Sequence, residues 1–135
     1  MTLARWLYRI AAIVLVLFAA GHTAGFLTFK PPSDAGLAVR EAMHGATFQL
    51  DGRSYTYEGF YKGFGLFVTA EMLFAAFVAW YLGAHPGNGA LGWALAALQA
   101  ASLVLSVIYF FPVTWIFSAV ILVCVAWAAW LGGGR

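Results

Sequence analysis

The chain has 135 residues, of which 64% are hydrophobic and 9% are charged, and its formal net charge is +2. Soluble domains carry about a quarter charged residues, so this composition excludes a soluble globular domain and indicates a small membrane protein. The small net charge gives no reason to expect nucleic-acid binding. Cys124 is the only cysteine, which excludes an intrachain disulfide and a metal site built from several thiolates.

The first predicted membrane span covers residues 4–29. Residues 10–29 carry no charged side chain, which matches the length of about 20 apolar residues that a helix needs to cross a bilayer. The span ends before Lys30-Pro31-Pro32, because proline lacks the N–H that a continuing helix requires. Two arginines ahead of an apolar run also resemble a signal peptide, but the length of the run favours a retained helix.

Residues 30–59 are predicted to form a loop outside the membrane. Ser33-Asp34 can cap a short helix that runs to about Met43, and Gly45 is its stop signal. Asp51-Gly52 lies between two segments of alternating character, residues 47–50 and 53–57, which predicts a β-hairpin. Its apolar face should lie on the helix ends. Four aromatic residues of the loop and the following helix are candidates for contact with a partner: Phe48, Tyr55, Tyr57 and Tyr61.

Three further spans are predicted at residues 60–83, 89–110 and 112–131. The long apolar run over 89–131 would be about 65 Å as one helix, roughly twice the thickness of the hydrocarbon core. It must therefore fold back, and Pro112 marks the place because proline suits the first turn of a new helix. The predicted fold is an all-α membrane protein. A single domain of residues 1–135 forms a four-transmembrane-helix bundle, with an extramembrane loop of a short helix plus a β-hairpin between the first two spans.

An even number of spans places both termini on one side of the membrane. Lysine and arginine are divided between the two sides. Arg5 and Arg9 lie beside the first helix, which often dominates orientation, so we expect both termini in the cytoplasm.

Polar side chains inside the spans are the candidate site. Glu71 is the only formally charged side chain between Lys62 and Arg135, and an acid at membrane depth costs about 2.5–3.5 kcal/mol on insertion scales. His22 and Glu71 lie at similar distances from Lys30 and Lys62, so they should have similar depths on antiparallel helices. We expect a His22–Glu71 pair, which other polar residues could extend: Thr23, Thr69, Gln99 and Ser102.

Three interpretations of this network stay open: a structural clamp between helices, a site for a ligand, pigment or partner subunit, and a proton or ion path. His22 could hold a metal or haem as a single axial ligand. His44 lies in the predicted outer loop and His85 in the turn on the opposite side of the membrane, so neither can reach the depth of His22. No metal site is therefore predicted. A bound lipid or pigment is the cofactor that the sequence leaves open.

Two elements carry a resemblance to a known family. Gly21-His22-Thr23-Ala24-Gly25 closes the first predicted helix, and Phe60-Tyr61-Lys62-Gly63-Phe64-Gly65 opens the second. They resemble the G-H-T-x-G and F-Y-x-G-F-G elements of an uncharacterised family of small bacterial four-helix membrane proteins. The resemblance implies a four-span protein of the bacterial cytoplasmic membrane, and it implies no activity.

The sequence contains no predicted catalytic residues. We therefore expect a non-enzymatic accessory or scaffolding subunit of a larger integral-membrane complex, for example a photosynthetic or respiratory one. Its expected partners are the lipid bilayer and other membrane subunits. The main alternative is a protein that handles a small molecule or an ion through His22 and Glu71, and a lipid-modifying enzyme is a third.

Overall fold

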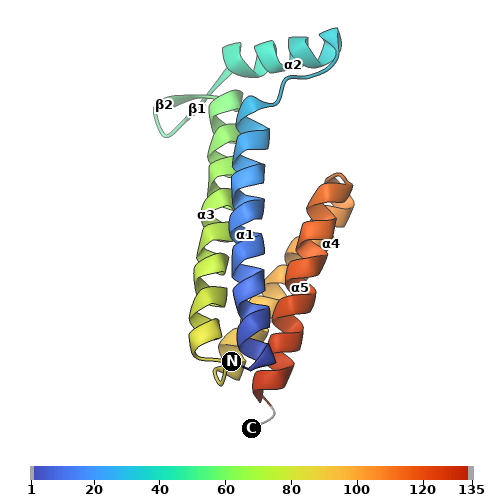
Figure 1. Ribbon diagram of the computed structural model, residues 1–135. Coiled ribbons are helices and arrows are strands. Elements are labelled where there is room, and N and C mark those ends of the chain that lie inside the picture. The colour runs from blue at the N-terminus through green and yellow to red at the C-terminus, as the bar shows by residue number, and fades with distance from the viewer. Residues whose placement is uncertain (1, 134–135) are drawn as a thin grey trace. The chain divides into compact units, whose positions relative to one another are not determined.

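The computed structural model describes residues 2–133, and Figure 1 shows its elements. In chain order these are α1 (Leu3–Thr28), α2 (Asp34–Gly45), β1 (Thr47–Leu50), β2 (Arg53–Thr56), α3 (Tyr57–Ala84), α4 (Gly89–Tyr109) and α5 (Pro112–Gly133). The helices α1, α3, α4 and α5 are long and apolar enough to cross a membrane. The predicted all-α class with four spans is thus confirmed, as is the loop of a short helix plus a β-hairpin.

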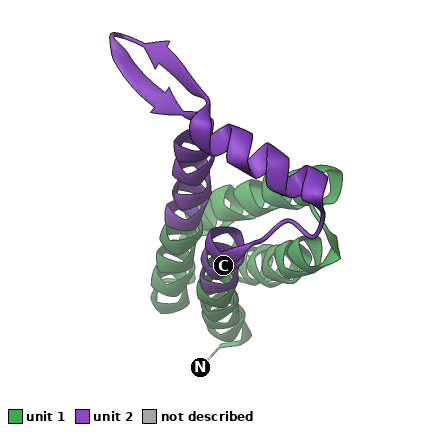
Figure 2. Ribbon diagram, turned by 90° about the horizontal axis from the view of Figure 1, so that it is seen from above, with its two compact units in different colours: residues 1–19, 72–135 green, residues 20–71 purple. Residues whose placement is uncertain are grey.

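The described chain divides into two compact units, coloured separately in Figure 2. One unit contains α4, α5, α1 up to Ala19 and α3 from Met72 onward. The other comprises residues 20–71, which include the rest of α1 and α3 together with α2 and the hairpin. The helices α1 and α3 each belong to both units, and each unit is described below by itself.

The core of the first unit is rich in alanine. Its buried apolar side chains come from all four long helices, and the largest of those that are completely buried are Tyr8, Leu15, Leu82, Ile121 and Val125. Alanines fill most other positions on the facing sides of α1 and α3. Helices in lipid associate through van der Waals packing, for which small residues allow close approach of the backbones. The small side chains therefore favour tight packing of this unit.

A glycine makes room for the largest buried side chain. Tyr8 is 0% exposed, and its hydroxyl lies so close to Gly92 that a β-carbon there would overlap the oxygen. That hydroxyl has no hydrogen-bond partner among the described residues. At the next residue of α1, the Arg9 guanidinium lies 3.4 Å from the centroid of the Trp80 ring, a cation–π contact.

The helices α4 and α5 form the expected hairpin. Pro112 begins α5, and only Phe110 and Phe111 separate the two helices. The hydroxyl groups of Ser106 and Ser118 are buried and lie 3.2 Å apart, so one hydrogen bond joins the helices near the turn. The sequence analysis did not single out this serine pair.

The second unit has no buried residue: every residue from 20 to 71 is exposed or half-buried. As predicted, Ser33 caps α2, because its Oγ accepts a hydrogen bond from the Gly36 N–H at 3.2 Å. The helix ends at Gly45, but the cap residue is Ala46 in an extended conformation. The left-handed turn typical of a glycine stop is not used there, because the chain passes directly into β1.

The hairpin has the predicted register. Phe48 pairs with Tyr55 across the two strands, and Asp51 and Gly52 both have positive φ, 50° and 73°. Positive φ at both central residues is the geometry of the tight turn that Asp-Gly favours. The strand β2 ends at Thr56, so α3 begins three residues earlier than the predicted residue 60. The Thr56 hydroxyl accepts the Gly59 N–H at 3.0 Å and caps α3.

Candidate functional site

The polar cluster of the second unit consists of His22, Thr23, Thr69 and the backbone carbonyl of Gly65. His22 Nε2 donates a hydrogen bond to the Gly65 carbonyl at 3.1 Å. The hydroxyls of Thr23 and Thr69 lie 2.8 Å apart, and Thr69 also donates to the Gly65 carbonyl at 3.1 Å. Three of the residues predicted to form a network therefore meet between α1 and α3.

Glycine at position 65 permits this meeting. The Phe26 ring packs on the Gly65 backbone, and a β-carbon at this position would lie 2.7 Å from the ring. Phe26 also faces His22, with the ring centroids 5.3 Å apart. The glycine thus lets an aromatic ring from α1 and the imidazole one turn earlier both reach the backbone of α3.

Glu71 lies apart from this cluster. Glu71 lies six positions after Gly65 along α3, a rise of about 9 Å, and the two residues fall on different faces of the helix. The imidazole of His22 is directed to the Gly65 end of that interval. Glu71 Oε1 is buried and has no hydrogen-bond partner among the described residues. The expected bond between His22 and Glu71 is replaced in the structure by the bond from His22 to Gly65.

The two remaining network candidates, Gln99 and Ser102, lie on α4 in the other compact unit. Gln99 is 3% exposed, and Ser102 is half-buried. The described range 2–133 contains no group of three His, Cys, Asp or Glu side chains placed to hold a metal ion.

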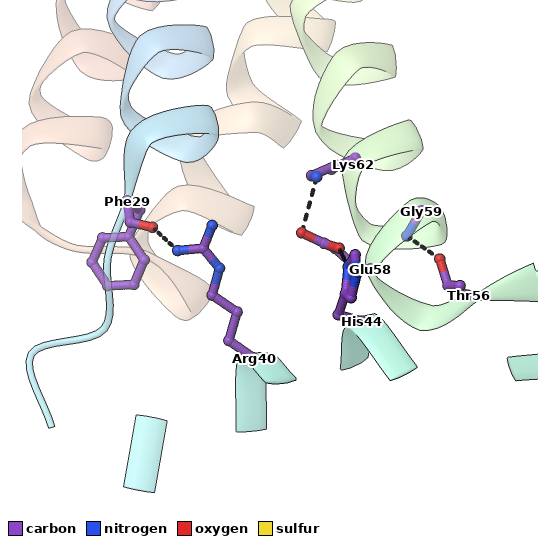
Figure 3. Close-up of polar contacts among 7 residues, drawn as sticks. All are labelled: Phe29, Arg40, His44, Thr56, Glu58, Gly59 and Lys62. Atoms are coloured by element: carbon purple, nitrogen blue, oxygen red, sulfur yellow. Dashed lines mark hydrogen bonds and ion pairs between the residues drawn. The ribbon is translucent and has the colours of Figure 1, made fainter. Parts of the chain in front are cut away.

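An ionic cluster links the extramembrane helix α2 to the start of α3 (Figure 3). The Glu58 carboxylate accepts hydrogen bonds from His44 Nδ1 at 2.5 Å and from Lys62 Nζ at 2.9 Å. Arg40 Nη1 donates to the Phe29 carbonyl at 3.0 Å, which ties α2 to the end of α1 as well. The sequence analysis missed this cluster, although Glu58 and Lys62 have the spacing of an ion pair on a helix.

A partly enclosed cavity of about 280 Å³ lies beneath α2. Its wall includes the charged residues Arg40, Glu58 and Lys62. The other lining residues are mostly apolar, among them Phe26, Phe29, Pro31, Val39, Met43 and Tyr61. The cavity is therefore amphipathic, with apolar walls and charged groups on part of its surface. Tyr61, a predicted partner-contact residue, belongs to this cavity.

The other predicted contact residues form an aromatic cluster, which we define as Phe48, Tyr55, Tyr57, Phe60 and Phe64. The Phe48 ring is central, with centroids 5.7 Å from Tyr55, 5.1 Å from Tyr57 and 5.7 Å from Phe60. Phe60 in turn contacts Phe64 at 4.8 Å. All members except Phe48 are at least 40% exposed. The sequence analysis missed Phe60 and Phe64, whose spacing of four residues on a helix was the available signal.

Four apolar helices of spanning length define the chain as a multi-pass integral membrane protein. Comparisons with protein-family models, with curated proteins and with solved structures found no match. The function must therefore be argued from the residues themselves.

Proposed function

We propose that the chain is a non-enzymatic accessory subunit of a larger integral-membrane complex, and that the aromatic cluster contacts the partner subunit. The observation that carries this proposal is the absence of any buried residue in the predicted extramembrane loop, positions 30–59, all of which the structure describes. Ordering a helix and a hairpin costs a large amount of conformational entropy. The burial of apolar surface normally supplies the free energy that offsets this cost. A partner subunit would supply the missing burial.

The aromatic composition of the exposed surface supports contact with a protein partner rather than with water. Tyr55 and Tyr57 lie at the end of the hairpin outside the predicted hydrocarbon region, yet they are 40% and 51% exposed. Exposed apolar patches outside the membrane mark interaction sites, and tyrosine and phenylalanine are enriched in protein interfaces. A two-stranded hairpin is also only marginally stable by itself. The hairpin therefore fits a surface that is completed on assembly.

Purification of the tagged chain from its native membrane in a mild detergent tests this proposal. We expect a second membrane subunit in stoichiometric amount by mass spectrometry. The Phe48→Ala variant should retain little of this second subunit, because truncation of an interface anchor costs about 2 kcal/mol or more of binding free energy. Tyr109→Ala removes a tyrosine that is 72% exposed outside the cluster and is the matched control. A homogeneous chain without partners, or equal loss in both variants, would contradict the proposal.

We also propose, from the resemblance of the two sequence elements, that this membrane is the bacterial cytoplasmic membrane, with both termini in the cytoplasm. Arg5 and Arg9 beside α1 support this orientation under the positive-inside rule. Fusions of alkaline phosphatase, which is active only outside the cytoplasm, should be inactive at the C-terminus and active after Gly52. The reverse pattern would show the opposite orientation.

A second candidate function rests on the unpartnered oxygen of Glu71. An intramembrane acid usually has a partner or a function, so a small molecule or an ion could meet this carboxyl. In that case Glu71→Gln should abolish uptake or binding and leave the fold intact, whereas His22→Gln should act mainly on stability because His22 already has the Gly65 carbonyl as a partner. Preserved function in Glu71→Gln would remove this candidate.

A further inference from the structure

We propose that the cavity beneath α2 binds an anionic phospholipid, with its phosphate at Arg40 and its glycerol and first acyl carbons against the apolar wall. The cavity lies where two spans end. Its lining comes from the last residues of α1 and the linker that follows, from α2, and from the first two turns of α3. The helix α3 has 28 residues, or about 42 Å, against a hydrocarbon core of about 30 Å. The first turns of α3 can therefore reach the headgroup layer.

The charged groups on the wall favour an anion. Arg40 and Lys62 are positive and Glu58 is negative, which leaves one excess positive charge on the lining. Glu58 is already satisfied by Lys62 at 2.9 Å and by His44. The excess charge is therefore located at Arg40. A phosphodiester carries a single negative charge and matches this excess.

The geometry of Arg40 suits a phosphate. A guanidinium group has five N–H donors, and a hydrogen bond from Nη1 to the Phe29 carbonyl holds it at the end of α1 (Figure 3). Its remaining donors have no partner among the described residues and can bind phosphate oxygens in the forked arrangement that arginine makes. The bond to Phe29 also orders the long side chain before any ligand arrives, which lowers the entropic cost of binding.

The apolar wall distinguishes a lipid from a soluble phosphate. Val39 and Met43 on α2 face the cavity together with Phe26 and Tyr61 from the two spans. A volume of about 280 Å³ is just below the range of about 300–1,000 Å³ for pockets that bind small molecules. The cavity therefore takes part of a lipid and leaves the acyl tails along the helices. A zwitterionic lipid carries its own ammonium group beside the phosphate and gains less from the excess charge at Arg40.

Native mass spectrometry of the full chain in detergent tests the proposal. The protein is titrated with phosphatidylglycerol and with phosphatidylcholine that has the same acyl chains. We expect phosphatidylglycerol to bind more tightly, and Arg40→Gln to weaken its binding about tenfold, which corresponds to about 1.4 kcal/mol. Arg53→Gln removes the same charge from β2, outside the cavity, and should leave binding unchanged. Arg40→Lys should restore part of the affinity, because it keeps the charge and loses the fork.

Val39→Asp provides a second variant that keeps Arg40 and its bond to Phe29. A carboxylate on the apolar wall should weaken phosphatidylglycerol binding while circular dichroism shows unchanged helix content. Three results would overturn the proposal. These are equal weakening by Arg40→Gln and Arg53→Gln, equal affinity for the two lipids, and displacement of the lipid by soluble glycerol 3-phosphate at millimolar concentration.

Discussion

Replacing Glu71 by leucine should raise the free energy of unfolding by about 2 kcal/mol. The Oε1 atom of this side chain is buried without a hydrogen-bond partner among the described residues. A buried polar atom that has lost its water and gained no partner costs about 1–3 kcal/mol. Leucine removes that cost because it replaces the carboxyl side chain with an apolar one of similar size. Glu71→Gln should give a smaller gain, because the amide is neutral but still needs partners. SDS titration in mixed micelles measures the free energy of unfolding of the unchanged protein and of both variants.

Glu58→Leu is the matched control for this prediction. The Glu58 carboxylate accepts hydrogen bonds from His44 and Lys62, so its removal should lower stability or loosen α2, opposite in sign to Glu71→Leu. A loss of stability in Glu71→Leu would contradict the prediction and would mean that the carboxyl has a partner in the intact protein. A gain in stability with loss of the native activity or assembly would show that Glu71 is kept for function at the expense of stability.

Gly92→Ala should lower the free energy of unfolding by about 2–3 kcal/mol. The new methyl group would overlap the Tyr8 hydroxyl and would lie 3.1 Å from the Ala129 β-carbon. Tyr8 and Ala129 are both completely buried, so neither can move away without disturbing its neighbours. Gly21→Ala makes the same chemical change on α1, where no atom lies within 4 Å of the new carbon apart from the neighbouring residues and the helix's own backbone, and it should cost nothing.

Tyr8→Phe should rescue much of this loss. The Tyr8 hydroxyl has no hydrogen-bond partner among the described residues, so its removal frees space and leaves no group unsatisfied. We expect Tyr8→Phe alone to be neutral or to stabilise by about 1 kcal/mol. The double variant with Gly92→Ala should show an interaction free energy of about 1–2 kcal/mol in a double-mutant cycle. Additive effects of the two substitutions would show that the hydroxyl and the glycine do not meet.

Much of the fold could be predicted because the bilayer imposes strict lengths and charge limits. Span ends followed from Pro31 and Pro112, and the hairpin turn followed from Asp51-Gly52. The start of α3 was predicted too late, at residue 60, because alternating residues up to Tyr57 suggested a longer strand. Thr56 caps the helix there, and a cap depends on which backbone N–H groups are left free, a local competition that residue pattern alone does not resolve.

The candidate site was less predictable, for a geometric reason. Counting residues from Lys30 and Lys62 gives the depth of His22 and Glu71, but a contact also requires the correct rotation of each helix. Rotation depends on side-chain packing, here on the ring of Phe26 against Gly65. That packing directs His22 to the Gly65 carbonyl. The ionic cluster at Glu58 likewise depends on where α2 returns to α3, which no periodicity in either segment encodes.

The two-residue turn between α4 and α5 has a consequence for the synthesis of the protein. Phe110 and Phe111 are apolar. The nascent chain therefore has no hydrophilic loop between the two helices that could be translocated across the membrane after α4 has inserted. The backbone N–H and C=O groups of the turn must also be satisfied wherever they cross lipid. We therefore expect α4 and α5 to enter the bilayer together as a helical hairpin, with α5 completing the insertion of α4. Truncation of nascent chains after Tyr109 should leave α4 poorly inserted, as scored by protease accessibility, and stable insertion of the truncated chain would show that α4 enters alone.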